Sequence, residues 1–149
     1  MGSILASVLE LPFYDLDAVI ESLAEMRISD IFRASGEDRF RELESEYLER
    51  LLKKNERMIL ALGGGCLLKE ANLLSVQEHG ILFTLTASAE ALQRRREQQL
   101  GKRPLAFDET ALLRLLRDRK QHYDSLPNRI DTTKLSPAEV AARIAAQIK

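Results

Sequence analysis

Apolar residues follow two patterns along the chain: short continuous runs, and longer segments in which they recur every three or four positions. Continuous runs such as Met58–Leu62 and Ile81–Leu85 predict strands of a parallel sheet that are buried on both faces. The longer pattern predicts amphipathic helices, one of which would turn Phe40, Leu43, Tyr47, Leu48 and Leu51 inward. The predicted helices cover residues 4–9, 18–26, 28–33, 37–54, 68–77, 89–99 and 110–123, and a last helix begins at Ser136. Two more strands are predicted: a short one that starts at Leu11, and a last one that ends at residues 130–133.

Strands that alternate with helices indicate a three-layer α/β/α fold with a parallel sheet. A chain of 149 residues with this pattern is expected to form one domain, residues 1–149. Ligands of such sheets bind at the carboxyl ends of the strands. Asp15 and Asp17 follow the first predicted strand and Gly63–Gly65 follow the second, so both segments are expected to face one crevice.

Composition and charge exclude several classes of function. The formal net charge of −1 gives no reason to expect a nucleic acid or membrane partner. No apolar run approaches the ~20 residues of a membrane span, and Met1–Leu9 lacks the basic start of a secretory signal. The lone Cys66 excludes an internal disulfide and suits a reducing cytoplasm. It has a weak case as a nucleophile and a better one as a small core or turn residue.

The first candidate motif is Asp15-Leu-Asp17, which could hold a divalent metal or bind substrate hydroxyls. Alternation along a strand would place both carboxylates on one face, where they repel unless a cation or donor lies between them. Judged alone, Asp17 is better explained as the N-cap of the helix that follows.

Two further motifs carry an arginine and glycines. Arg41 lies on a predicted helix, where most arginines are solvated, and Glu44 three residues on could orient its guanidinium. Gly63-Gly-Gly65 could be a simple turn, but a turn needs only one glycine. Each glycine in regular structure lowers stability by roughly 0.5–1 kcal/mol through lost conformational entropy. The run therefore indicates close contact with a ligand.

Basic residues gather later in the chain. Arg94-Arg-Arg96 and Lys102-Arg103-Pro104-Leu105 form either a charged surface loop or a phosphate site. Asp118-Arg119-Lys-Gln-His-Tyr123 places a further arginine on a predicted helix.

Taken in this order, the motifs resemble those of shikimate kinases, from Met1 almost to the C-terminus. The resemblance implies a fold like that of P-loop nucleoside monophosphate kinases, and transfer of the ATP γ-phosphoryl to the 3-hydroxyl of shikimate with Mg²⁺. It implies a cytoplasmic monomer of aromatic amino acid biosynthesis whose partners are shikimate and ATP.

The resemblance also implies a role for each candidate residue. Arg41 and Arg119 would clamp the shikimate carboxylate, with Glu44 supporting Arg41. Asp17 would bind the reacting hydroxyl beside the backbone of Gly63, Gly64 and Gly65, with Gly64 donating its N–H. Asp15 would belong to the magnesium shell. Arg103 would close over the ATP phosphates from a lid at about residues 94–107, with Arg96 as a second arginine near the nucleotide.

Shikimate kinases carry a phosphate-binding loop, Gly-x-x-x-x-Gly-Lys-Ser/Thr, that is absent from these 149 residues. We expect that the N-terminal strand and this loop are missing, through a mis-assigned start or a real truncation, and that the chain alone is inactive. A non-catalytic shikimate-binding or regulatory paralogue, or a kinase for another small hydroxy acid, remains as an alternative.

Overall fold

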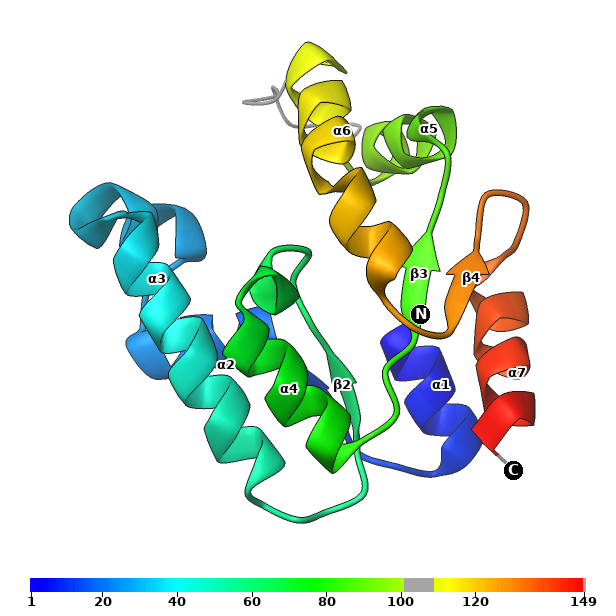
Figure 1. The fold of residues 1–149 in the computed structure, drawn as a ribbon, viewed down its shortest axis with the longest axis horizontal. Helices are drawn as coiled ribbons and strands as arrows, with labels where there is room; N and C mark the ends of the chain where they lie inside the picture. The colour runs from blue at the N-terminus through cyan, green and yellow to red at the C-terminus, as the bar shows by residue number, and fades with distance from the viewer. Residues whose placement is uncertain (101–108, 149) are drawn as a thin grey trace. The chain divides into compact units, whose positions relative to one another are not determined.

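The computed structural model describes residues 1–100 and 109–148 (Figure 1). The chain divides into two compact units, which we call unit 1 and unit 2. Unit 1 comprises Met1–Ile81 together with the residues from Ala141 onward, and unit 2 comprises Leu82–Val140. That residues 1–149 form a single domain stays a prediction.

Unit 1 contains one pair of parallel strands among helices. Strand β1 pairs with β2 in a register that sets Phe13 beside Ile59 and Asp15 beside Ala61. Because the two strands are parallel, the residues after Asp15 and after Ala61 leave the sheet at the same edge. The elements of unit 1 are α1 (Gly2–Leu9), β1 (Phe13–Asp15), α2 (Leu16–Ala24), α3 (Ile28–Leu52), β2 (Ile59–Ala61), the 3₁₀ helix η1 (Cys66–Leu68) and α4 (Glu70–His79).

Helix α3 consists of two helical segments that meet at Gly36. This glycine has φ 82° and ψ 170°, a backbone conformation that side chains other than hydrogen rarely allow. The sequence predicted a turn at Gly36 between two helices, and the structure confirms it. The second segment buries Phe40, Leu43, Leu48 and Leu51 as expected, while Tyr47 is half-buried.

One charged residue interrupts that apolar face. Glu44 is 1% exposed and lies between Leu43 and Leu48 on the buried side of α3. Burial of a carboxylate is costly unless it is paired and hydrogen-bonded. Its presence in the core of unit 1 indicates a polar site beneath α3.

Unit 2 holds a second pair of parallel strands, β3 with β4, in which Thr84 is set beside Arg129 and Thr86 beside Asp131. Ser136 caps the C-terminal helix as predicted: its hydroxyl accepts the Glu139 N–H at 3.2 Å, and the Glu139 carboxylate accepts the Ser136 N–H at 2.7 Å. The elements that lie in unit 2 or begin there are β3 (Thr84–Thr86), α5 (Ala89–Leu100), α6 (Glu109–Ser125), β4 (Arg129–Asp131) and α7 (Pro137–Ile148).

Two expectations about the strands were wrong. The strand predicted at Ile81–Leu85 begins only at Thr84, where pairing with β4 starts, and Ile81 is 64% exposed. Strand β2 is half-buried throughout instead of buried on both faces. In the described part of the chain each strand pairs with one neighbour, so apolar composition overstated the burial.

Candidate functional site

Asp15 closes strand β1 and caps helix α2. Its Oδ1 accepts the backbone N–H groups of Asp17 at 3.0 Å and Ala18 at 3.4 Å. The N-cap is therefore Asp15, and the sequence interpretation of Asp17 as the cap was wrong. The expected strand-like alternation of the two carboxylates also fails, because β1 ends at Asp15 and Asp17 already lies in the first turn of α2.

Asp17 is left with an unsatisfied carboxylate. Its Oδ1 is buried and has no hydrogen-bond partner among the described residues. Burial raises the pKa of Asp17, and the negative charges of Asp15 and Glu21 raise it further, against a smaller lowering by Arg41. A buried oxygen without a partner costs free energy in the unliganded protein, so it is suited to accept a hydrogen bond from a ligand.

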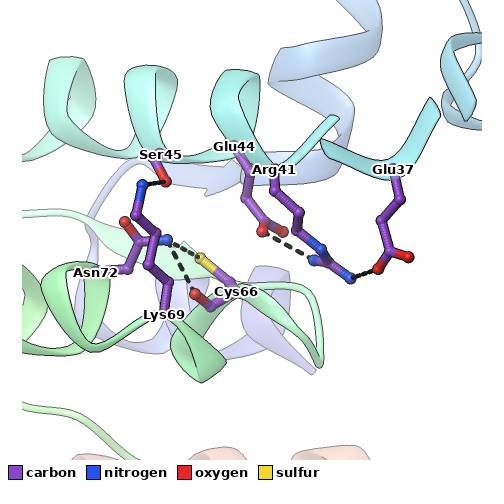
Figure 2. A network of polar contacts seen from close by, with 7 residues as sticks. All are labelled: Glu37, Arg41, Glu44, Ser45, Cys66, Lys69 and Asn72. Atoms are coloured by element: carbon purple, nitrogen blue, oxygen red, sulfur yellow. Dashed lines mark hydrogen bonds and ion pairs between the residues drawn. The ribbon is translucent and has the colours of Figure 1, made fainter. Parts of the chain in front are cut away.

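Arg41 is held between two carboxylates on its own helix (Figure 2). Its Nη1 donates to Glu44 Oε1 at 2.9 Å and its Nη2 to Glu37 Oε1 at 3.4 Å. Its guanidinium carbon also lies 5.2 Å from the centre of the Phe40 ring. Burial lowers the pKa of Arg41, but the hydrogen bonds and charges of Glu44 and Glu37 outweigh that effect and raise it. The predicted support of Arg41 by Glu44 is present.

The glycine run, which we call the glycine loop (Gly63–Gly65), touches both of these groups. A Cβ at Gly63 would lie 3.3 Å from Oδ1 and 3.4 Å from Oδ2 of Asp17. A Cβ at Gly65 would lie 2.6 Å from Nη2 and 2.8 Å from Nη1 of Arg41. Gly65 has φ −102°, so its missing side chain serves close approach and not an unusual backbone conformation. Gly64, between them, is exposed.

Three segments that are distant in sequence therefore meet in unit 1: the first turn of α2, the second segment of α3 and the glycine loop. The structure thus brings together Asp17, Arg41, Glu44, Gly63 and Gly65. An acceptor, a cationic fork and flexible backbone beside one another can bind a small molecule that carries both hydroxyl and carboxylate groups.

Cys66 directly follows the glycine loop, and the Asn72 side chain on α4 is hydrogen-bonded to its carbonyl. Cys66 is fully buried, and burial, followed by the negative charge of Glu44, raises its thiol pKa to about 12. At that pKa the thiol stays protonated near neutral pH, which favours the core role over a nucleophile. The sequence analysis missed Asn72. Its position four residues before Val76 puts the two side chains on the same face of α4, and a polar residue on that apolar face could have marked it.

The remaining candidates belong to unit 2. Arg96 on α5 and Arg119 on α6 are both half-buried, and Arg103 lies outside the described residues. The neighbouring Arg95, which the sequence did not single out, donates from Nη1 to Thr132 Oγ1 at 3.0 Å and from Nη2 to the Thr132 carbonyl.

The carboxylates of unit 1 fit a magnesium ion only as a partial set of ligands. No group of three or more His, Cys, Asp or Glu side chains in residues 1–100 and 109–148 could hold a metal ion by itself. Mg²⁺, however, is commonly held by one or two carboxylates together with water and substrate phosphates. Asp15, which is exposed, and Asp17 with its unpartnered Oδ1 meet that requirement.

The cluster lies at the carboxyl ends of parallel strands. This arrangement is typical of α/β proteins that bind a small molecule at the edge of the sheet. The chain matches the family model described as shikimate kinase over residues 1–149, and it belongs to the shikimate kinase family.

Relatives of known name agree with this assignment. A shikimate kinase of Thermodesulfovibrio yellowstonii is 35% identical over 146 residues, covering 97% of this chain and 84% of that protein. One from Streptococcus suis is 40% identical over 146 residues, covering 93% and 88%. The solved shikimate kinase of Acinetobacter baumannii in complex with shikimate has a TM-score of 0.82 and 30% identity, covering 99% of this chain and 83% of that one.

Several sequence predictions are thereby confirmed. The fold is the three-layer α/β/α arrangement of P-loop nucleoside monophosphate kinases. The protein is a phosphotransferase of aromatic amino acid biosynthesis that uses ATP as co-substrate with Mg²⁺. No helix in the described part of the chain is both long enough and apolar enough to cross a membrane.

Proposed function

We propose that the protein transfers the γ-phosphoryl group of ATP to the 3-hydroxyl of shikimate. The new bond joins that oxygen to the γ-phosphorus, the bond to the β-phosphate oxygen breaks, and shikimate 3-phosphate and ADP leave. The observation that carries this proposal is the meeting of Asp17, the Arg41–Glu44 pair and the glycine loop in a member of the shikimate kinase family. The expected setting is a cytoplasmic monomer without nucleic acid or membrane partners.

Arg41 is the proposed first arm of a clamp on the shikimate carboxylate. The bonds to Glu44 and Glu37 use two N–H groups of its guanidinium, and an arginine carries about five, so others are available to a ligand. Glu44 holds the fork in one orientation, which reduces the entropy lost on binding. Arg119, which is half-buried on α6, is the proposed second arm, because the resemblance of its segment to shikimate kinases implies that role.

Asp17 is the proposed partner of the reacting hydroxyl. Its buried Oδ1 lacks a hydrogen bond, and a substrate O–H would supply one. A carboxylate with a raised pKa is also a better proton acceptor, so Asp17 can take the hydroxyl proton as the oxygen attacks. The backbone of Gly63, Gly64 and Gly65 is expected to lie against the same substrate, with the Gly64 N–H as donor.

Asp15 is the proposed magnesium ligand, and the ion, when bound, supplies positive charge to the phosphate oxygens. Arg103 and Arg96 are expected to meet the charge that develops on the transferred group. A phosphoryl transfer of this kind depends mainly on positioning and electrostatic stabilisation.

Residues 1–149 contain no Gly-x-x-x-x-Gly-Lys-Ser/Thr sequence. We infer that a polypeptide of these residues alone has negligible kinase activity, because removal of even one preorganised donor can cost ~10²–10³ in rate. A version extended at the N-terminus by a strand and such a loop, called here the loop-bearing chain, is expected to be active.

A coupled ADP-release assay with shikimate tests the proposal on both chains. We expect turnover by the loop-bearing chain, a fall of ~10²–10⁴ in its kcat on Asp17→Asn, and little turnover by residues 1–149. Full activity of residues 1–149 would contradict the need for a loop, and no activity of either chain on shikimate would contradict the proposed reaction.

The second candidate is a non-catalytic protein that binds shikimate. The intact cluster in residues that lack the phosphate loop favours it. It predicts that residues 1–149 bind shikimate without nucleotide and that the loop-bearing chain gains no activity. A kinase for another small hydroxy acid such as gluconate is less well supported, because it does not explain two arginines for a carboxylate.

A further inference from the structure

Asn72 is a polar residue on the buried face of α4, and the roles assigned above do not include it. It is 5% exposed, and Val76, one helical turn later, is buried on the same face. A buried amide is costly unless it is hydrogen-bonded, so its partner indicates why an asparagine is tolerated here.

That partner is the residue that follows the glycine loop. Asn72 Nδ2 donates to the Cys66 carbonyl at 2.9 Å and lies 3.9 Å from the Cys66 Sγ (Figure 2). Cys66 is in turn tied to the glycines, because its own N–H donates to the Gly63 carbonyl at 3.1 Å. One side chain of α4 therefore holds the C-terminal end of the loop.

Side-chain packing does not fix the conformation of the loop, although the Gly65 carbonyl also accepts the Leu68 N–H at 3.3 Å. Three consecutive glycines have no side chains to pack and can adopt many backbone conformations. Yet its contacts are close: Gly65 lies directly against the Arg41 guanidinium and Gly63 against the Asp17 carboxylate. A small displacement of Cys66 would shift Gly65 and Gly64 relative to both groups.

We propose that Asn72 is a positioning residue that holds the glycine loop against Asp17 and Arg41 and thereby sets the affinity for the hydroxy acid substrate. The substrate part of this inference rests on the proposed function. Asn72 acts through the Cys66 carbonyl and need not touch the substrate.

Amide hydrogen exchange followed by NMR tests the positioning without any ligand. The first variant, Asn72→Leu, keeps the approximate shape of the side chain but lacks the Nδ2 donor. The second, Asn72→Ala, replaces it if leucine does not fit the buried site. Lys69→Met is the matched control, because it removes the Lys69–Ser45 hydrogen bond of 3.2 Å at the exposed side of the same region. We expect exchange at Gly64, Gly65 and Cys66 to be about tenfold faster in the Asn72 variants, as loss of one hydrogen bond allows.

The comparison with α3 separates positioning from general stability. Amides of α3 should keep their exchange rates in the Asn72 variants, and Lys69→Met should leave the glycine loop unchanged. Equal acceleration in α3 and in the loop would mean that Asn72 only stabilises the unit, and unchanged exchange in the loop would overturn the proposal outright.

Titration calorimetry with shikimate tests the consequence for binding. The affinity for shikimate should fall about tenfold in the Asn72 variants. In Lys69→Met it should stay within about twofold of that of the unsubstituted protein, called here the parent. Parental affinity in variants whose loop exchanges faster would overturn the substrate part. If the parent itself does not bind shikimate, the proposed function fails, whereas the exchange measurement still decides the positioning role.

Discussion

The two arginines expected to bind one carboxylate differ in how the protein holds them. Arg41 in unit 1 is tied to Glu44 and Glu37, lies against Gly65 and is near the Phe40 ring. Arg119 in unit 2 is half-buried, and no hydrogen bond or ion pair to another described residue holds its guanidinium. In the proposed clamp, Arg41 is held in place before substrate arrives, whereas the substrate would order Arg119. Arg41 should therefore matter for both folding and binding, and Arg119 for binding alone.

Arg41→Ala is expected to have the largest effect. Loss of one arm of the clamp should weaken shikimate binding by about 1.5–3 kcal/mol, roughly 10–100-fold. The melting temperature should fall too, because the buried Glu44 loses its bond to Arg41. Calorimetry and thermal melts measure both. The control is Arg39→Ala, which removes an exposed pair with Glu42 at 3.1 Å on the same helix and should change neither.

Arg119→Ala sharpens the comparison. It should weaken shikimate binding by a similar ~1.5–3 kcal/mol. The free energy of unfolding should stay within about 0.5 kcal/mol of that of the unsubstituted protein, so the melting temperature should hardly change. The same two measurements apply. A drop in melting temperature as large as that of Arg41→Ala would show that Arg119 is also held in the folded protein, and unchanged affinity would place the carboxylate elsewhere.

Gly65→Ala tests the preorganised arm without removing it. The new methyl group would force the Arg41 guanidinium, 2.6 Å away, out of its orientation. Such a displacement costs on the order of 0.5–1.5 kcal/mol in shikimate affinity. Gly63→Ala, whose Cβ meets Asp17 at the less severe 3.3 Å, should cost less. The reverse order in a titration would mean that the loop yields more easily at Gly65 than at Gly63.

The smallest effect concerns stability against pH at Asp17. Burial, with the charges of Asp15 and Glu21, raises its pKa above 3.8, so the folded protein binds this proton more tightly than the unfolded chain. As pH rises from 3.8 through the folded pKa, this group therefore lowers stability. Asp17→Asn should raise the melting temperature at pH 7, with a gain that shrinks as the pH falls toward 3.8. A gain that does not change with pH would exclude titration of Asp17 as its cause.

Much of the site could be predicted because its spacing is local. Arg41 and Glu44 are three residues apart on a helix, so their contact follows from helical geometry. The arrival of Asp17 and the glycine loop at one edge follows from parallel pairing of two predicted strands. Both features could therefore be inferred from the sequence without knowing which distant segments come into contact.

Other features depended on contacts that no local pattern records. Which aspartate caps α2 was decided by where β1 stops pairing with β2, which makes Asp15 the cap and leaves Asp17 unsatisfied. The late start of β3 was decided by its register with β4.

By itself, the sequence determined the order of the elements, the parallel fold and the identity of the Asp17, Arg41 and glycine motifs, because each rests on short-range periodicity or on residue type. Only the tertiary structure decided how tightly they meet: that Gly65 makes room for the guanidinium, and that Asn72 holds Cys66 behind the loop. The physical reason is that close packing and the satisfaction of buried polar groups depend on partners distant in sequence, which only the folded chain brings together.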